Sequence, residues 1–183
     1  MPPWRRVTMR DTIFAETQID IYQSTDIAAL RARIDELGLK VEHQATWGKT
    51  VDEVIKTYVE PKLIQPTFIM DYPEEVSPFA KKKADQEGFV ERFEQYIGGF
   101  EVGNAFTELN DPLDQYQRFK EQARQRAAGD AEAHQIDMDF IEALMHGMPP
   151  TGGLGVGVDR LVMLLTNQAS ISEVILFPQL RTY

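Results

Sequence analysis

Carboxylates and an amide stand inside a segment that otherwise has the composition of a buried strand. The segment IGGFEVGNAFTELND, residues 97–111, carries Glu101, Asn104 and Glu108 among glycine, aliphatic and aromatic residues. Alternate side chains of a strand point to the same face, so Asn104, Phe106 and Glu108 are predicted to share one face. An amide, an aromatic ring and a carboxylate in a row form a plausible cation pocket.

Two further carboxylates reach this face only under certain conditions. Glu94 lies on the preceding segment, and Glu101 falls on the opposite face of a regular strand. Gly103 could accommodate a β-bulge that turns Glu101 round, so that Glu94, Glu101 and Glu108 converge. Converging carboxylates ionise together only with cations among them, which implies a divalent metal ion, a bound amine, or both. Alternatively, Glu94 and Glu101 face solvent and Glu108 caps or pairs locally.

The glycine-rich stretch TGGLGVGVDR, residues 151–160, is a second candidate site. Val158 stands where a dinucleotide fingerprint needs glycine, and no Gly-Lys-Ser/Thr sequence follows, so both common nucleotide loops match poorly. Three glycines alternate along one strand face and could form a flat floor for a planar group: Gly153, Gly155 and Gly157. Arg160 lies in the first turn of the next helix, where it could face an anion together with backbone N–H groups. Alternatively, the glycines only allow close helix–strand packing.

The apolar periodicity indicates which elements position these residues. Segments 89–97 and 100–109 flank Gly98-Gly99, a pair that favours a two-residue hairpin turn, and they predict an antiparallel pair. Residues 66–73 form a short apolar run between prolines and predict another strand. The glycine stretch is predicted to run from a strand directly into an apolar helix.

Helical spacing accounts for most of the remaining chain. A helix is predicted in residues 26–39 with Ser24 or Thr25 as its cap, and another in residues 49–63. A third begins at Pro112 with Asp111 as its cap, and a short one follows in residues 137–150. The expected fold is an α+β domain with a central antiparallel sheet on which the helices pack, rather than a parallel doubly wound sheet.

The bulk composition excludes several classes of protein. The 183 residues, 43% of them hydrophobic, can bury one sizeable core, and no apolar run could span a bilayer or serve as a signal sequence. We therefore expect a cytoplasmic protein without membrane contact.

No cysteine is present and the three histidines are scattered, so any metal ion would be held by oxygen. The net charge of −10 argues against a broad nucleic-acid footprint. The basic run Lys81–Lys83 is expected to be a solvated loop, with contact to an anion as the alternative.

Three separated stretches resemble one family, the class II lysyl-tRNA synthetases. FEQYIGGFEVGNAFTELNDPLDQYQRF and PPTGGLGVGVDRLVMLLTNQASISEVILFPQLR carry the resemblance, and the second contains the motif 3 of that class. PTFIMDYPEEVSPFAKKK is similar to a strand and loop of the family. The resemblance extends over essentially the whole chain from PPWRRVTM onward. It favours a functional role for the carboxylates and the glycine-rich stretch over the alternatives of solvent exposure and close packing.

The resemblance implies a role for each site residue. Glu94 and Glu101 would hold Mg2+ that bridges the phosphates of ATP, and Asn104, Phe106 and Glu108 would bind lysine, with Glu108 facing its ε-ammonium group. The implied ATP site consists of Glu94, Glu101, Val102, Gly155, Gly157, Val158, Asp159 and Arg160. Arg160 and Glu101 would act catalytically. The lysine carboxylate would attack the α-phosphate and displace pyrophosphate, and the lysyl group would then pass to tRNA.

Departures from the family leave three interpretations open. The chain resembles the C-terminal half of a catalytic domain, and we find no anticodon-binding barrel, motif 1 or motif 2 in it. We therefore expect it to lack aminoacylation activity and to bind little nucleic acid by itself, although the full-length enzyme would be a homodimer. It could instead be a paralogue that lysylates a protein such as an elongation factor, but those relatives tend to carry alanine in place of Gly103. The third interpretation is a non-catalytic binding or regulatory module.

Overall fold

The computed structural model describes residues 3–131 and 133–179. Within these residues five strands form one sheet in the order β1-β2-β3-β4-β5. The strands are β1 (Arg5–Thr8), β2 (Thr67–Pro73), β3 (Phe89–Ile97), β4 (Phe100–Thr107) and β5 (Gly152–Val156). The helices are α1 (Met9–Thr17), α2 (Ile27–Glu36), α3 (Trp47–Tyr58), α4 (Pro112–Ala127), α5 (Met138–Met145) and α6 (Val158–Thr166). The predicted α+β class is confirmed.

The direction of the strands corrects one expectation. The pairs β2–β3, β3–β4 and β4–β5 are antiparallel, but β1 runs parallel to β2, so the sheet is mixed. The sequence between these two strands contains α1, α2 and α3. A helical crossover of that length lets the chain return in the same direction, whereas a tight turn would reverse it.

The hairpin contains the expected turn and an irregularity that reorients one carboxylate. Gly98 and Gly99 have φ values of 67° and 86°, as a two-residue hairpin turn requires. Gln95 pairs with Gly103, but the next residue, Tyr96, pairs with Glu101. Val102 is therefore an extra residue in β4, which is a β-bulge directly beside Gly103. The predicted bulge is confirmed, and it puts Glu101 on the same sheet face as Tyr96.

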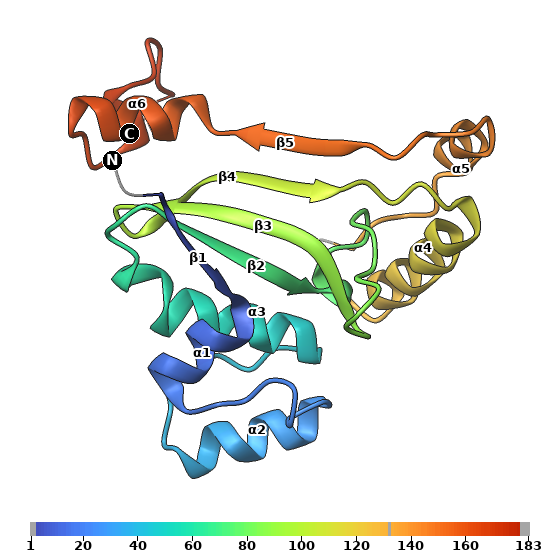
Figure 1. The fold of residues 1–183 in the computed structure, drawn as a ribbon, viewed down its shortest axis with the longest axis horizontal. Coiled ribbons are helices and arrows are strands. Elements are labelled where there is room, and N and C mark those ends of the chain that lie inside the picture. The colour runs from blue at the N-terminus through green and yellow to red at the C-terminus, as the bar shows by residue number, and fades with distance from the viewer. Residues whose placement is uncertain (1–2, 132, 180–183) are drawn as a thin grey trace.

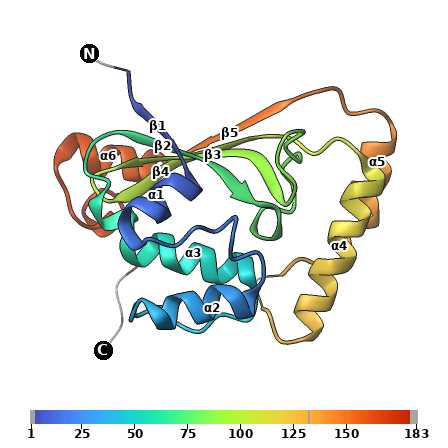
Figure 2. The ribbon, with the colours of Figure 1, turned by 60° about the horizontal axis from the view of Figure 1, so that its bottom comes forward.

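One face of the sheet is covered by helices in two layers. Figures 1 and 2 show α1 and α3 against the sheet and α2 on their outer side. The core lies between these layers and includes Met9, Ile13, Leu30, Val51, Val54, Ile55, Ile69, Tyr72, Val90 and Tyr96. The buried residues of α3 recur at helical spacing, which is why this helix packs along one side.

The helix caps agree with the sequence except at α2. The carboxylate of Asp111 accepts hydrogen bonds from the backbone N–H groups of Leu113 and Asp114, as predicted for α4. The cap of α2 is Asp26, which accepts from the N–H of Ala29, so the prediction of Ser24 or Thr25 was wrong. The carboxylate of Asp26 satisfies a helix-terminal N–H group that the earlier residues do not reach.

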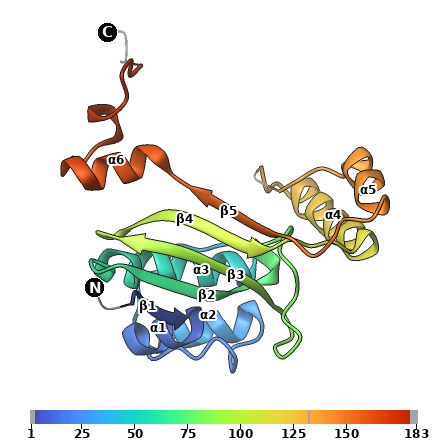
Figure 3. The ribbon, with the colours of Figure 1, turned by 45° about the horizontal axis from the view of Figure 1, so that its top comes forward.

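The last elements lie apart from the helical layers. Figure 3 shows α4 and α5 at one end of the sheet and α6 at the opposite end, joined by the edge strand β5. Several apolar side chains of β5 and α6 are exposed: Leu154, Val156, Val158 and Leu165. In the described part of the chain, no helix is long and apolar enough to cross a membrane.

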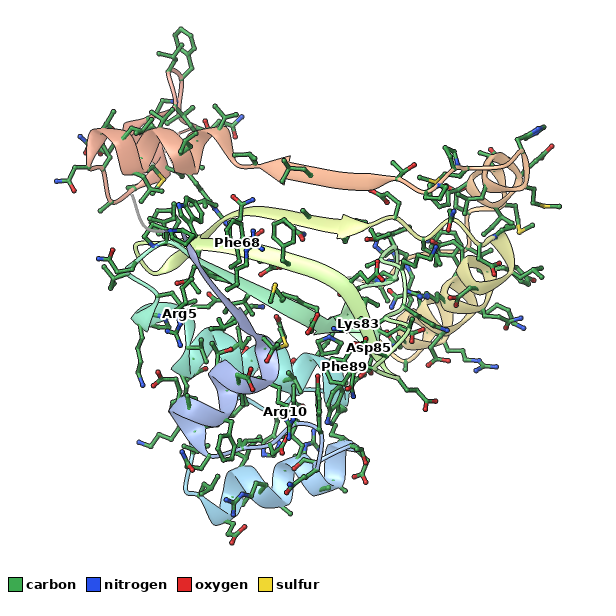
Figure 4. All side chains as sticks on the ribbon, viewed as in Figure 1. Arg5, Arg10, Phe68, Lys83, Asp85 and Phe89 are labelled. Atoms are coloured by element: carbon green, nitrogen blue, oxygen red, sulfur yellow. The ribbon has the colours of Figure 1, made fainter. Side chains whose placement is uncertain are left out.

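The basic run Lys81–Lys83 is tied to carboxylates rather than freely solvated. Lys82 lies 3.2 Å from a carboxylate oxygen of Glu74 and 3.1 Å from one of Asp114. Lys83 lies 2.9 Å from Asp71 and 3.7 Å from Asp85, and Figure 4 shows Lys83 and Asp85 beside the start of β3. Two of these three cations therefore neutralise acidic side chains of the protein, so neither of the two predicted roles describes them.

Candidate active site

The site occupies the sheet face formed by β3 and β4. Arg92, Glu94 and Tyr96 pair with Phe106, Asn104 and Glu101, respectively, and paired residues of an antiparallel sheet point to the same side. The predicted alternation is confirmed for both strands. Because of the bulge, two carboxylates, an amide and an aromatic ring share this face.

Glu94 is buried, and its partners come from its own strand β3 and from β2. Its Oε2 accepts hydrogen bonds from the hydroxyl groups of Tyr72, at 2.7 Å, and Tyr96, at 2.6 Å. Its Oε1 accepts from Arg92, which neutralises the charge. Only 8% of the surface of Glu94 is exposed. The carboxylate is therefore held in a fixed orientation.

Arg92 connects this carboxylate to the amide of Asn104. Its Nε donates to Asn104 Oδ1 at 3.1 Å, and its Nη1 donates to the hydroxyl of Ser77 at 2.8 Å. The Oδ1 atom of Asn104 thus accepts from Arg92, and within the described residues its amide hydrogens make no hydrogen bond. The sequence analysis assigned no role to Arg92 or Tyr96. Tyr72 was missed because it belongs to β2.

A cleft of about 530 Å³ borders the two carboxylates. Its walls come from the sheet, from α3 and from α4. Glu60, Glu94 and Glu101 contribute acidic groups. Burial, and then the nearby charge of Glu94, raise the pKa of Glu101. Burial also raises the pKa of Glu60. The cleft thus holds more negative charge than its own cations neutralise, and it favours binding of a cation.

The bulge of β4 meets the start of α6. Arg160 donates to the backbone oxygen of Glu101 at 2.7 Å and lies 3.4 Å from its carboxylate. The N–H of Gly157 donates to the backbone oxygen of Val102 at 2.9 Å. Val158 and Asp159 are exposed in the first turn of α6. The residues that were expected to form the phosphate end of the site are therefore adjacent in space.

Strand β5 lies beside β4, and two of its glycines lie on the site face. Gly153 pairs with Phe106 and Gly155 pairs with Asn104, which confirms the alternation for these two residues. The third glycine, Gly157, lies beyond the strand and caps α6. A Cβ atom on Gly153 would lie 1.9 Å from a carboxylate oxygen of Glu108, so a side chain there would displace that carboxylate.

Glu108 does not join the other two carboxylates. It lines a separate pocket of about 290 Å³, whereas Glu94 and Glu101 line the larger cleft. Asn104 and Phe106 lie between them along the chain, so the expected single cleft is divided into two parts. Burial raises the pKa of Glu108. Within the described residues, no donor makes a hydrogen bond or ion pair with its carboxylate.

Comparison with known proteins identifies the family. The profile of the family described as tRNA synthetases class II (D, K and N) matches residues 1–181. The chain belongs to the class II tRNA synthetases. This synthetase chain is 61% identical over 180 residues to the lysine–tRNA ligase of Chloroflexus aurantiacus, and the alignment covers 98% of the chain. It is 58% identical to that of Roseiflexus sp. and 56% identical to that of Thermosynechococcus vestitus, again over 98% of the chain.

The alignments cover only part of each relative. The chain spans 37% of the Chloroflexus and Roseiflexus proteins and 36% of the Thermosynechococcus protein. It thus accounts for about a third of the length of these lysine–tRNA ligases.

Proposed function

We propose that this synthetase chain carries part of the active site of a lysine–tRNA ligase, which activates lysine with ATP and transfers it to tRNA. The names of relatives at 56–61% identity support this function. The observation that carries the proposal is the separation of charge along β4 and β5. Glu108, a partly buried carboxylate without a hydrogen-bond or ion-pair partner among residues 3–131 and 133–179, lies at one end, and Arg160 lies against Glu101 at the other. These ends suit an ammonium group and a phosphate, respectively.

The lysine side chain would lie along the face of β4. An ammonium group next to Glu108 would stabilise the charged form of a carboxylate that burial otherwise disfavours. Phe106 would contact the aliphatic part of the side chain, and the free amide hydrogens of Asn104 would donate to the ligand. The small surface of Gly153 leaves room for the carboxylate of Glu108, and Gly155 leaves open space beside Asn104 for the ligand.

The residues present fit a magnesium ion held with ATP. Glu94 and Glu101 supply carboxylate oxygens from one face, and a cation would favour the charged form of Glu101, whose pKa is raised by burial and then by the charge of Glu94. In residues 3–131 and 133–179, no group of three or more acidic or histidine side chains could hold a metal ion. This agrees with the usual Mg2+ site, in which one or two carboxylates are completed by water and substrate phosphates. When bound, the ion would offset the charge of the phosphates.

The reaction would proceed without a covalent bond to the protein. The lysine carboxylate attacks the α-phosphorus of ATP, the bond to the pyrophosphate oxygen breaks, and lysyl-adenylate forms. A ribose hydroxyl of tRNA then attacks the carbonyl carbon and releases AMP. Arg160 would face the phosphates and stabilise their charge, while Glu108 and Asn104 would orient the amino acid.

We further propose that the chain corresponds to the C-terminal half of a class II catalytic domain with motif 3. The run from the glycine strand β5 into α6, with Arg160 in the first turn, supports this assignment. Other parts of the longer protein would supply the remaining motifs, the tRNA contacts and the homodimer interface. The alternative of a protein-lysylating paralogue is disfavoured at Gly103, because a Cβ atom there would lie 2.9 Å from the backbone oxygen of Gly155.

Lysine-dependent ATP–pyrophosphate exchange tests the proposal. We expect exchange with lysine and none with norleucine in the longer protein. Arg160→Ala is expected to lower the rate about a hundredfold, because one charge-assisted contact in a desolvated site contributes roughly 3 kcal/mol. The isolated chain is expected to charge no tRNA. Exchange that is equally fast with norleucine, or equal charging by the chain and the longer protein, would contradict the proposal.

A further inference from the structure

The guanidinium group of Arg92 is held on several sides at once. Its Nη1 donates to the hydroxyl of Ser77 at 2.8 Å and to the backbone oxygen of Val76 at 3.1 Å. Its Nη2 donates to Oε1 of Glu94, and its Cζ lies 4.6 Å from the ring centroid of Tyr72. Only 16% of its side chain is exposed. These contacts leave the guanidinium little freedom to rotate, so its Nε–H group points in a fixed direction.

This Nε–H group determines which way the amide of Asn104 faces. It donates to Oδ1 of Asn104 at 3.1 Å. A guanidinium has donors and no acceptor, so the opposite orientation of the amide would set its NH2 group against another donor. Within the described residues the NH2 group makes no hydrogen bond, and its nitrogen is accessible at the surface. Asn104 therefore offers two N–H donors to a ligand.

Open space lies beside Asn104 on the side of β5. Its strand partner there is Gly155, so no side chain of that strand covers the amide at this position. Among the described residues, a Cβ atom on Gly155 would contact only the backbone oxygen of Asn104, at 3.7 Å. A ligand that lies on this face of the sheet can therefore reach the amide hydrogens.

From this arrangement we infer that Arg92 is a positioning residue for the carboxylate of lysine, and that it acts by holding the amide of Asn104 with its hydrogens toward the ligand. The inference rests on the function proposed above. Lysine has one acceptor group, its carboxylate, because its two ammonium groups only donate. The carboxylate is also the nucleophile, so the amide would align the group that attacks ATP. Without the Nε–H donor, the amide could turn over and present an oxygen, which repels a carboxylate.

Two ligands distinguish this role from a purely structural one. Lysine and 1,5-diaminopentane, which lacks the carboxylate, are titrated by calorimetry without ATP into the longer protein and its Arg92→Lys variant. The substitution keeps a positive charge beside Glu94 but removes the planar guanidinium and its Nε–H group. We expect lysine binding to weaken about tenfold and diaminopentane binding to stay unchanged, because only lysine loses a bond to a charged acceptor. Equal weakening of both ligands, or of neither, would overturn the inference. Arg124→Lys, at an exposed position on α4, is the control.

A double-mutant cycle tests whether Arg92 acts through Asn104. Asn104→Ala alone should also weaken lysine binding about tenfold, and adding Arg92→Lys to it should cause no further loss. Losses that add would overturn the inference. The cycle needs lysine alone, so it also decides the matter if diaminopentane binds too weakly to measure.

A third variant decides if Arg92→Lys fails to fold. In Asn104→Asp, Arg92 would hold one carboxylate oxygen and the other would face the lysine carboxylate, so lysine should bind more weakly than to Asn104→Ala. Equal or tighter binding would overturn the inference. Glu108→Gln, run in parallel, keeps the proposed function apart: if it weakens both ligands while Arg92→Lys does not separate them, only the role of Arg92 is rejected. If Glu108→Gln weakens neither ligand, the proposed function fails.

Discussion

The two carboxylates Glu94 and Glu108 differ in the number of hydrogen-bond donors that the described residues provide to them. Glu94 is buried with three protein donors, two tyrosine hydroxyl groups and a guanidinium. Glu108 has none among the described residues, although burial raises its pKa. A fixed carboxylate keeps its position whether or not a ligand is present, whereas an unsatisfied one gains most when a ligand arrives. The contrast indicates that Glu94 organises the site and that Glu108 recognises the substrate.

Replacing Glu94 should have the largest effect on stability. Glu94→Gln would leave Arg92 mostly buried without its counter-charge, and breaking such a pair costs about 3 kcal/mol. We expect a Tm lower by roughly 6–12 °C in thermal unfolding. The control is Glu91→Gln, an exposed position on the same strand. Equal Tm values for the two variants would show that Glu94 does not organise this face.

Replacing Glu108 should affect binding while sparing stability. Glu108→Gln removes the charge that faces the ammonium group, so we expect lysine affinity to fall by about 2 kcal/mol, or roughly thirtyfold. Its Tm should stay the same or rise by about 1–2 °C, because a destabilised charge is gone. Isothermal titration with lysine and thermal unfolding measure the two quantities. A lower Tm with unchanged lysine affinity would reverse the roles assigned to the two carboxylates.

Removing a single hydrogen-bond donor of Glu94 should destabilise the protein less than removing its charge. Tyr72→Phe removes one of its three donors and leaves the ring in the core, so we expect a loss of about 1 kcal/mol in the free energy of unfolding. Chemical denaturation with urea measures it, and Tyr116→Phe, on the less buried surface of α4, is the control. A loss as large as that of Glu94→Gln would mean that the hydroxyl group, and not the charge pair, holds the carboxylate.

The smallest expected effect is the pH dependence contributed by Glu108. Its pKa is raised in the folded protein, so the folded state binds more protons than the unfolded state between the ordinary glutamate pKa and the raised value. In this window stability falls as pH rises, and Glu108→Gln should remove that slope. Lysine needs the ionised carboxylate, so its affinity should fall as pH drops through the raised pKa. Stability and affinity profiles of both proteins measure this, and identical profiles would contradict it.

Local sequence predicted much of the fold because its signals act over a few residues. Gly98-Gly99 indicated the hairpin turn, Asp111-Pro112 the start of α4, and the glycine run the passage from β5 to α6. The parallel pairing of β1 could not be predicted, because it depends on how a crossover of almost sixty residues packs. The α2 cap was misassigned because several neighbouring polar residues can serve as caps.

The sequence predicted the candidate site only where the alternation of side chains along a single strand was sufficient. The shared face of Asn104 and Phe106 follows from alternation within β4, and the bulge was inferred from Gly103. The donors to Glu94 escaped prediction because Tyr72 is brought to it by sheet register over 22 residues. The separate pocket of Glu108 depends on α4 and α5, whose positions are set by packing rather than by local sequence.

Val102, the extra residue in β4, decides on which side of the sheet Glu101 lies. If the bulge were lost and Val102 paired with Tyr96 in a regular ladder, every acidic, amide and aromatic group of the site would be preserved, yet Glu101 would point to the other side of the sheet. Residues from Gly103 onward would keep their side. Two chains with the same site residues could therefore differ in function through the pairing of one apolar residue, and an inventory of polar positions would not reveal it.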